Sequence, residues 1–322
     1  MRWPLLLLLN AARPISTRAE IPAVVTLGNG RRFPLLGLGC ASGVRQSHVL
    51  SALEIGYRSF DTAQAYQWGY HEEEVGEAVY LSGISREELF LQSKIHPEDF
   101  GYAATKRALA VSLRRLNTTY LDAILLHKPR CWPGACARHP EGTWQESWRA
   151  LEDVLYDGLV RAIGICDVDG PLLEELLQQR QKPHIIQNWM DPFHQDREVR
   201  QRCREAGIQY QAYSSLGTQW VHFRGHIFNP VFAHPVLRTI AEQREGNVAQ
   251  VVLAWALHHG VAVIPASTSR ERQRSNLDSF GLQLSPADVA RIDGLDGALD
   301  PPSAEVTLEN SGKSKHSVHS EL

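Results

Sequence analysis

The chain has 322 residues, of which 43% are hydrophobic and 21% are charged, an ordinary composition for a soluble globular protein. Its formal net charge of −3 gives no reason to expect a nucleic acid or an anionic membrane as a partner. No apolar run approaches the ~20 residues that a membrane-spanning helix needs. The length suits two ordinary domains or a single α/β barrel, which takes about 250 residues.

Both ends of the chain differ in composition from the part between them. Residues 1–20, MRWPLLLLLNAARPISTRAE, have three arginines and no acid before Glu20, which suits a secretory signal or an organelle transit peptide. The last four residues, His319 to Leu322, resemble an endoplasmic-reticulum retention signal, with serine as a mismatch. Together the two ends favour the endoplasmic reticulum lumen over the cytosol. Residues 300–322 are predicted to be a disordered tail.

Residues 21–299 are predicted to form one domain. A hairpin at 24–33 is followed by short apolar runs that alternate with helical patterns, which predicts parallel βα units. There are eight such runs, the number of strands in a (β/α)8 TIM barrel. The predicted strands are 35–38, 59–61, 89–94, 123–127, 162–166, 185–187, 209–214 and 261–264. The predicted helices are 48–55, 73–81, 102–116, 145–157, 171–179, 198–206, 235–243, 248–258 and 270–277, with a last one starting at Ser285.

A doubly wound nucleotide-binding domain is the alternative fold. The stretch from Gly37 to Gly43, GLGCASG, is close to a dinucleotide-binding fingerprint, and Asp61 lies 22 residues after Gly39. The fingerprint needs its third glycine to open a helix directly, and the spacing here does not allow that. A tight glycine turn after the first barrel strand accounts for the same residues, so the barrel is favoured.

The five cysteines are too few and too scattered for a disulfide framework. Within the loop CWPGAC, Cys131 and Cys136 are either bridged or free. This loop lacks the partner pair that a zinc site needs, and no other ligand spacing is present, so no metal is expected.

Ionisable side chains follow three neighbouring predicted strands. Asp61, Lys94 and His127 each stand at the end of an apolar strand, where a parallel barrel builds its active site, and Tyr66 follows Asp61 by five residues. An ammonium beside a phenol lowers the phenol's pKa and makes it a better general acid. We therefore expect Tyr66 to donate a proton to a carbonyl oxygen, Lys94 and Asp61 to support it, and His127 to orient the substrate.

Five segments occur in an order that resembles a known family. GYRSFDTAQAY, LQSK, YLDAILLH, GLVRAIGI and QAYSSLG are similar to signature segments of the aldo-keto reductase superfamily, and the resemblance runs from about Val24 to Leu295. It implies a (β/α)8 barrel that reduces an aldehyde or ketone to an alcohol with NAD(P)H. We expect a monomer acting on a small carbonyl compound.

The same resemblance implies where the cofactor binds. An extended dinucleotide would lie over the mouth of the barrel, with Tyr213 stacked on the nicotinamide and Gln187 holding its carboxamide. The other implied cofactor residues are Cys166, Asp167, Ser214, Leu216, Ser267, Arg272 and Asn276. NADPH is expected, with NADH as the alternative.

Two parts of this cofactor site depart from the family pattern. Cys166-Asp167 replaces a Ser-Asn pair, and an ionised carboxylate cannot donate to the carboxamide oxygen. Ala266 replaces the usual lysine after Ile-Pro, which leaves Arg272 to stack on adenine or bind a 2′-phosphate.

The residues implied for the substrate pocket depart as well. Ala41, His96 and Lys128 stand where the family usually has aromatic residues, which implies a wide, polar and basic mouth. A polar or anionic carbonyl, such as a sugar or a keto acid, is therefore expected. Tryptophans are expected near the rim at 68, 132, 189 and 220 and in the core at 148 and 255.

Two other functions remain open. A nucleotide-binding barrel could serve as a sensor or regulatory subunit with little turnover, although the complete four-residue set argues against lost catalysis. A hydrolase on the same barrel is disfavoured by the missing metal-ligand cluster.

Overall fold

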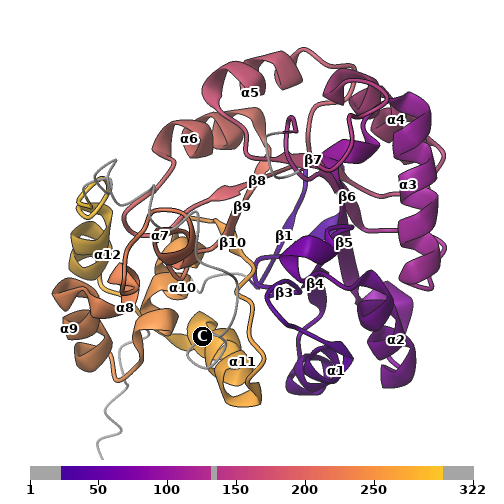
Figure 1. Cartoon of the computed structure of the whole chain (residues 1–322). Coiled ribbons are helices and arrows are strands. Elements are labelled where there is room, and N and C mark those ends of the chain that lie inside the picture. Colours follow the sequence, from indigo (N-terminus) through magenta and orange to yellow (C-terminus); the bar gives the residue numbers. More distant parts are fainter. Residues whose placement is uncertain (1–22, 132–135, 300–322) are drawn as a thin grey trace, which may run out of the picture.

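The structure is a computed structural model that describes residues 23–131 and 136–299 (Figure 1). The predicted amino-terminal segment, the carboxyl-terminal tail and Trp132 lie outside the described residues. Among the helices of the described ranges, none is long and apolar enough to cross a membrane.

Eight parallel strands form a curled sheet in the order β10-β9-β8-β7-β6-β5-β4-β3. Leu36 forms a parallel bridge with Val263, and the Gly37 N–H donates to the Val263 carbonyl at 3.0 Å, so the two ends of the sheet meet. The predicted (β/α)8 barrel is confirmed, and every predicted strand overlaps an observed one. The strands are β3 Leu38–Gly39, β4 Ser59–Asp61, β5 Phe90–Ile95, β6 Ala123–Leu126, β7 Ile163–Cys166, β8 Ile185–Trp189, β9 Gln209–Tyr213 and β10 Ala262–Val263.

Helices surround the strands and cover their outer side (Figure 1). All residues of β4 to β7 are buried, as expected for a parallel sheet enclosed by helices. The helices that match predicted ones are α1 Gln46–Ile55, α2 Glu72–Ser82, α3 Tyr102–Arg115, α4 Trp144–Tyr156, α5 Gly170–Leu177, α6 Arg197–Ala206, α9 Pro235–Gln243, α10 Val248–His258, α11 Arg270–Leu277 and α12 Pro286–Asp293. The short helices α7 Thr218–His222 and α8 Pro230–Ala233 were not predicted.

The predicted hairpin closes the amino-terminal end of the barrel. Its strands are β1 Val24–Thr26 and β2 Arg32–Pro34, paired antiparallel. Phe33 is fully buried, and its ring meets that of Phe90, the first residue of β5, edge to face with centroids 5.0 Å apart. Because the hairpin covers the amino-terminal end of the strands, a functional site is expected at their carboxyl-terminal end.

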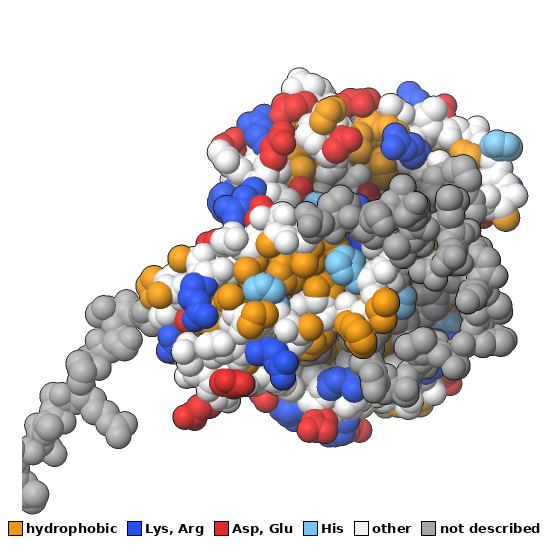
Figure 2. Space-filling view, turned by 60° about the vertical axis from the view of Figure 1, so that its left-hand side comes forward, with side chains coloured by type: hydrophobic (Ala, Val, Ile, Leu, Met, Phe, Trp, Pro, Cys, Tyr) orange, Lys and Arg blue, Asp and Glu red, His pale blue; other side chains and the backbone are white. Residues whose placement is uncertain are grey.

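Some large apolar side chains lie in the core, and others reach the surface. Trp148 and Trp255 are both 0% exposed, which confirms their predicted core positions. Figure 2 shows the face that carries α9 and α12, where hydrophobic side chains gather between scattered charges.

Candidate active site

Three neighbouring strands bring Asp61, Lys94 and His127 to one end of the barrel. Asp61 ends β4, Lys94 lies in β5, and His127 directly follows β6. The Lys94 Nζ donates to Asp61 Oδ2 at 2.5 Å and to the Thr62 carbonyl at 3.1 Å. Lys94 is 0% exposed and Asp61 only 2%, so the expected ion pair exists and is sealed from water.

Burial alone would favour a neutral Lys94, but its surroundings keep it charged. Desolvation opposes the ammonium, but the charge of Asp61, its hydrogen bond and the smaller contributions of Tyr70 and Cys166 together outweigh it, so the pKa of Lys94 lies above its usual value. Asp61 is held in turn by two amides. Its Oδ1 accepts from Gln92 Nε2 at 2.5 Å and from Gln187 Nε2 at 3.1 Å. Both glutamines also donate to Gln211 Oε1.

Tyr66 lies away from this ion pair. Its side chain is 43% exposed, and its hydroxyl donates to Glu73 Oε2 at 2.8 Å. The Arg115 guanidinium lies 5.0 Å from the centre of its ring. Burial and the hydrogen bond to Glu73 raise the pKa of Tyr66. The structure thus corrects the expected contact between Tyr66 and the Lys94 ammonium.

Tyr70 occupies the place that was expected for Tyr66. The Lys94 Nζ lies 4.9 Å from the centre of the Tyr70 ring, and that ring lies 5.7 Å from the imidazole of His127. Burial raises the pKa of Tyr70 to about 12, while the Lys94 ammonium acts in the opposite direction. Tyr70 is the functional candidate that the sequence analysis missed.

A short 3-10 helix explains the exchange of the two tyrosines. The helix η1 Tyr66–Trp68 ends at Gly69, whose φ of 79° is left-handed. A Cβ at Gly69 would lie 3.1 Å from the Ser42 backbone nitrogen, so the turn also needs the close approach that glycine permits. The turn exposes Tyr66 and directs Tyr70 inward. The available signal was the turn glycine immediately before a second tyrosine at the start of an acidic helix.

His127 is a neutral donor or acceptor at the same place. Burial, followed by the positive charges of Lys94 and Lys128, holds the pKa of His127 well below its usual range. Its Nδ1 is buried and has no hydrogen-bond partner among the described residues. The ring of Trp68 packs against it at 4.8 Å, so this predicted rim tryptophan does form an apolar wall.

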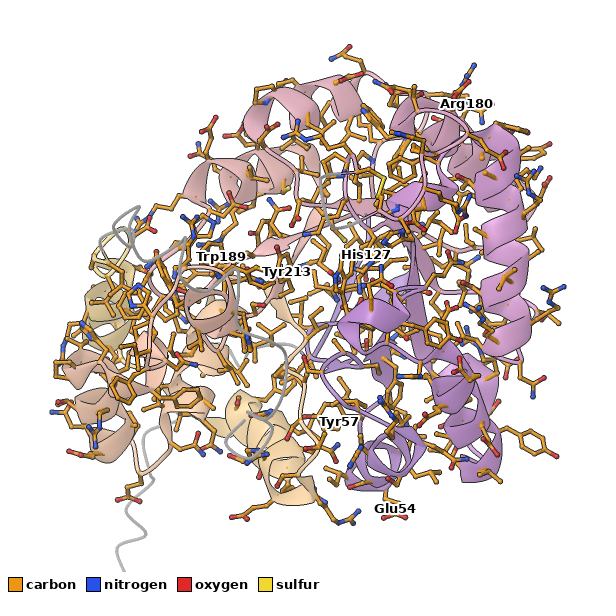
Figure 3. All side chains as sticks on the ribbon, in the orientation of Figure 1. Glu54, Tyr57, His127, Arg180, Trp189 and Tyr213 are labelled. Atoms are coloured by element: carbon orange, nitrogen blue, oxygen red, sulfur yellow. A yellow bond between two sulfur atoms is a disulfide. The ribbon has the colours of Figure 1, made fainter. Side chains whose placement is uncertain are left out.

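Of the predicted nicotinamide residues, Gln187 lies in β8 and binds Asp61, whereas Asp167 and Tyr213 lie at the ends of β7 and β9. The Tyr213 hydroxyl donates to Asp167 Oδ1 at 2.8 Å, and the Lys128 ammonium pairs with Asp167 Oδ2. Figure 3 shows His127, Tyr213 and Trp189 following one another across the middle of the molecule. The hydroxyl of Ser215 is buried without a hydrogen-bond partner in the described part of the chain.

Two of the predicted phosphate-binding residues, Ser267 and Arg272, lie at the start of α11, and Asn276 lies in its last turn. Ser269 caps this helix through the Arg272 N–H, and the Arg272 Nε donates to the Ser267 hydroxyl at 3.4 Å. Arg272 is exposed, whereas Ser267 and Asn276 are buried. The remaining cofactor positions, Cys166, Ser214 and Leu216, lie at the ends of β7 and β9.

The three predicted substrate-pocket positions differ in their surroundings. His96 is buried 5.5 Å from the Trp68 ring, and desolvation lowers its pKa. The charge of Lys128 is offset by Asp167. Ala41 is partly buried in the loop after β3. The mouth is therefore less basic than expected.

Trp220 lies in α7, in the segment after β9 that was expected to form part of the rim, but its side chain is buried. It is 6% exposed, and its Nε1 donates to Asp191 Oδ2 at 2.8 Å. Trp189 donates to the same oxygen at 2.9 Å, and its ring lies 5.2 Å from that of Trp220. The buried Asp191 carboxylate, just after β8, thus holds the two indoles together.

Cys131 and Cys136 form a disulfide, which resolves the alternative left open by the sequence. The three free cysteines of the described ranges, Cys40, Cys166 and Cys203, are all buried.

Comparison with known proteins agrees with this geometry. A model of the Aldo/keto reductase family matches residues 45–297. The chain is 39% identical over 276 residues to a glyoxal reductase of Bacillus subtilis, covering 84% of this chain and 92% of that protein. It is 35% identical to a morphine 6-dehydrogenase of Pseudomonas putida, covering 85% and 91%.

Solved structures agree as well. An aldo/keto reductase from Brucella melitensis superposes with a TM-score of 0.74 at 32% identity, covering 85% of this chain and 99% of that one. An aldo-keto reductase in complex with NADPH gives 0.77 at 25% identity, covering 88% and 90%. The family match and these relatives show that the chain belongs to the aldo/keto reductase family.

Proposed function

We propose that this protein reduces the carbonyl group of a small aldehyde or ketone to an alcohol with NADPH, and that Tyr70, rather than Tyr66, donates the proton. The observation that carries the proposal is the buried Lys94 ammonium between the Asp61 carboxylate and the Tyr70 ring. Tyr66 has a carboxylate partner instead, which holds its proton.

The proton transfer follows from the electrostatics of this group. A buried phenol resists ionisation, as the raised pKa of Tyr70 shows. The nearby ammonium stabilises the phenolate that forms when Tyr70 gives its proton to the carbonyl oxygen. Asp61 keeps Lys94 charged, and the neutral His127 is placed to donate a hydrogen bond to the same oxygen. The chain's own residues thus supply both the proton and the hydrogen bonds that stabilise the developing negative charge.

The residues at the mouth fit a nicotinamide dinucleotide. The unpartnered hydroxyl of Ser215 and the ring of Tyr213 lie at the end of β9, and the cationic, exposed Arg272 stands at the start of α11, where a phosphate is favoured. Tyr213 would stack on the nicotinamide and Arg272 would hold the far phosphate. When bound, NADPH supplies the hydride. One solved relative carries NADPH.

The substrate proposed here is polar but uncharged. Lys128 is neutralised by Asp167, and the lowered pKa of His96 favours its neutral form, so the anionic part of the expectation loses its support. His96 and Lys128 still offer hydrogen-bonding groups beside the apolar Trp68 ring. A sugar aldehyde or a small dicarbonyl fits such a mouth, and one relative is named a glyoxal reductase. No observation favours the sensor or the hydrolase alternative.

The compartment and the monomeric state remain predictions from the sequence. The Bacillus subtilis and Pseudomonas putida relatives give no support to the endoplasmic reticulum, because bacteria have none. The disulfide suits an oxidising compartment.

Two matched variants test the assignment of the proton donor. Tyr70→Phe removes the phenol beside Lys94, and we expect its kcat to fall by about 10²–10⁴-fold, the usual contribution of a general acid. NADPH binding, followed by nicotinamide fluorescence, should stay within about twofold. Tyr66→Phe is the control, and its kcat should stay within about threefold because only an exposed hydrogen bond to Glu73 is lost. If Tyr66→Phe abolishes turnover while Tyr70→Phe retains it, the assignment is wrong.

A further inference from the structure

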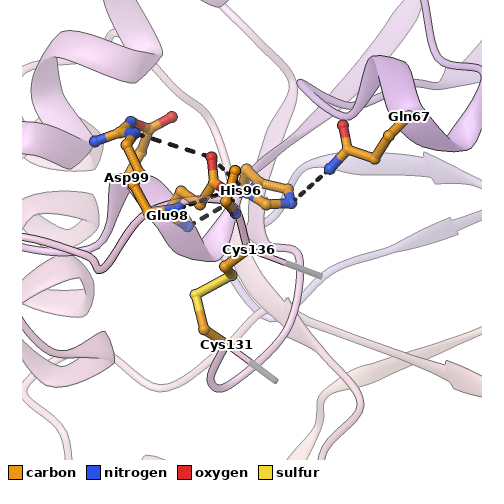
Figure 4. The surroundings of a disulfide bond; sticks show 8 residues. Gln67, His96, Glu98, Asp99, Cys131 and Cys136 are labelled. Atoms are coloured by element: carbon orange, nitrogen blue, oxygen red, sulfur yellow. Dashed lines mark hydrogen bonds and ion pairs between the residues drawn. A yellow bond between two sulfur atoms is a disulfide. The ribbon is translucent and has the colours of Figure 1, made fainter. Parts of the chain in front are cut away.

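Three metal-ligating side chains converge beside the mouth of the barrel. His96, Glu98 and Cys136 place their ligand atoms within 4.8 Å of one another (Figure 4). His96 and Glu98 follow β5, and Cys136 belongs to the disulfide loop after β6. The sequence analysis found no partner pair for the two cysteines, because these residues meet only in the folded chain.

The geometry is near that of a zinc site. Zinc binds sulfur at about 2.3 Å and nitrogen or oxygen at about 2.0–2.2 Å, so tetrahedral ligand atoms lie about 3.6 Å apart. The three atoms here would have to close by about 1 Å, which is small for a surface loop.

Backbone contacts already hold the three groups together. One oxygen of Glu98 accepts from the backbone N–H of Ala137, the residue directly after Cys136, and from that of Arg138 at 3.4 Å. The Glu98 N–H donates to His96 Nδ1 at 3.3 Å, and the other Glu98 oxygen lies 3.9 Å from that nitrogen. Pro97 stands between the two ligands in the 3-10 helix η3 Pro97–Asp99. The carboxylate thus anchors the cysteine loop to the histidine.

The charges of the set suit a divalent cation. A carboxylate and a thiolate would neutralise Zn²⁺, and the His96 imidazole can supply the third ligand atom in exchange for one of its hydrogen bonds, to Gln67 or to the Glu98 N–H. Arg138 lies 3.9 Å from Glu98 and opposes a cation, but its side chain is 53% exposed and can turn toward Asp99, with which it already pairs.

We propose that reduction of the Cys131–Cys136 disulfide creates a zinc site whose protein ligands are His96, Glu98 and Cys136, with water in the fourth position. A dithiol reductant gives two electrons and two protons to the disulfide and becomes a disulfide itself. Cys136 then loses its proton as its sulfur binds Zn²⁺. In the oxidised protein the sulfur is committed to Cys131, so the site is closed.

Zinc binding by the full-length protein tests this proposal without any substitution. Equilibrium dialysis against Zn²⁺ should show one site in the reduced protein that the oxidised protein lacks, with at least about a 100-fold difference in dissociation constant. Co²⁺ should give thiolate charge-transfer absorption in the reduced protein alone. Equal binding in both redox states would overturn the proposal.

Single cysteine variants make the test sharper. Cys131→Ser leaves Cys136 as a free thiol, so it should bind one Zn²⁺ with no reductant present. Cys136→Ser equally prevents the disulfide but removes the ligand, so it should bind at least about 100-fold more weakly in either state. If the two variants bind alike, the site does not use Cys136.

Two carboxylate variants complete the set. Glu98→Gln should weaken binding by at least about tenfold. Its control is Glu87→Gln, in the exposed 3-10 helix η2 Arg86–Glu88, which should bind like the wild type. The double variant Cys131→Ser/Cys136→Ser measures zinc bound elsewhere on the chain. Unchanged affinity in Glu98→Gln would remove the carboxylate from the proposed ligand set and overturn the site as stated.

Discussion

Two buried carboxylates lie at the ends of strands that are four positions apart in the sheet, and they are stabilised in different ways. Asp61 ends β4 and pairs with the Lys94 ammonium. Asp191 follows β8, is 0% exposed and accepts from the indoles of Trp189 and Trp220 and from the Phe193 N–H. Burial raises the pKa of Asp191 to about 6. Asp61 thus has a cation as its partner at the proposed catalytic group, whereas Asp191 has only neutral donors and joins two aromatic side chains.

Removing the cation should have the largest effect. Lys94→Met leaves Asp61 buried without a counter-charge, and breaking a buried pair in this way costs about 3–5 kcal/mol in the free energy of unfolding. Turnover should also be lost, because the phenolate of Tyr70 is no longer stabilised. Urea denaturation and steady-state kinetics measure the two effects. The control is Lys106→Met, whose partner Asp157 lies 4.0 Å away at the surface and whose loss should cost less than about 1 kcal/mol.

Asp191, whose partners are neutral donors, should make the stability of the protein depend on pH. The folded protein holds the Asp191 proton more tightly than the unfolded chain does, so this residue contributes stability below about pH 4, and the contribution disappears as pH rises through about 6. The amide of Asp191→Asn does not titrate in this range. The stability of the wild type relative to this variant should therefore fall by about 2 kcal/mol between pH 4.5 and pH 7. A relative stability that rises with pH would contradict the raised pKa.

The barrel could be predicted because each strand and helix leaves its own pattern in a short stretch of the sequence. Buried parallel strands are short apolar runs, and the segments between them carry helical patterns with capping residues such as Asn247 and Ser285, both of which cap their helices. The short helices α7 and α8 have only five and four residues, too few for a periodic pattern.

The candidate site was predictable only in part. Asp61, Lys94 and His127 converge because strand ends meet at one edge, which the order of elements already implies. Tyr70 was missed because a five-residue spacing does not reveal where a 3-10 turn ending at Gly69 directs each ring. His96 and Cys136 are 40 positions apart, and only the folded loops bring them together.

The smallest effect is expected at the proposed cofactor rim, where Asp167 is paired with a cation, as Asp61 is, but is partly exposed. Asp167 pairs with Lys128 at 28% and 21% exposure, so its loss should change stability by less than about 1 kcal/mol. Asp167→Asn removes a negative charge from the place proposed for the nicotinamide and supplies an amide that can both donate and accept. NADPH should bind up to about tenfold more tightly, a gain of about 1.4 kcal/mol, with kcat unchanged. Nicotinamide fluorescence titration measures this, with Asp157→Asn as the control for a surface aspartate paired with lysine. Weaker binding in Asp167→Asn would mean that the Lys128–Asp167 pair itself orients the cofactor. Asp167 and Asp61 would then differ in exposure, but each would act by holding a lysine in place.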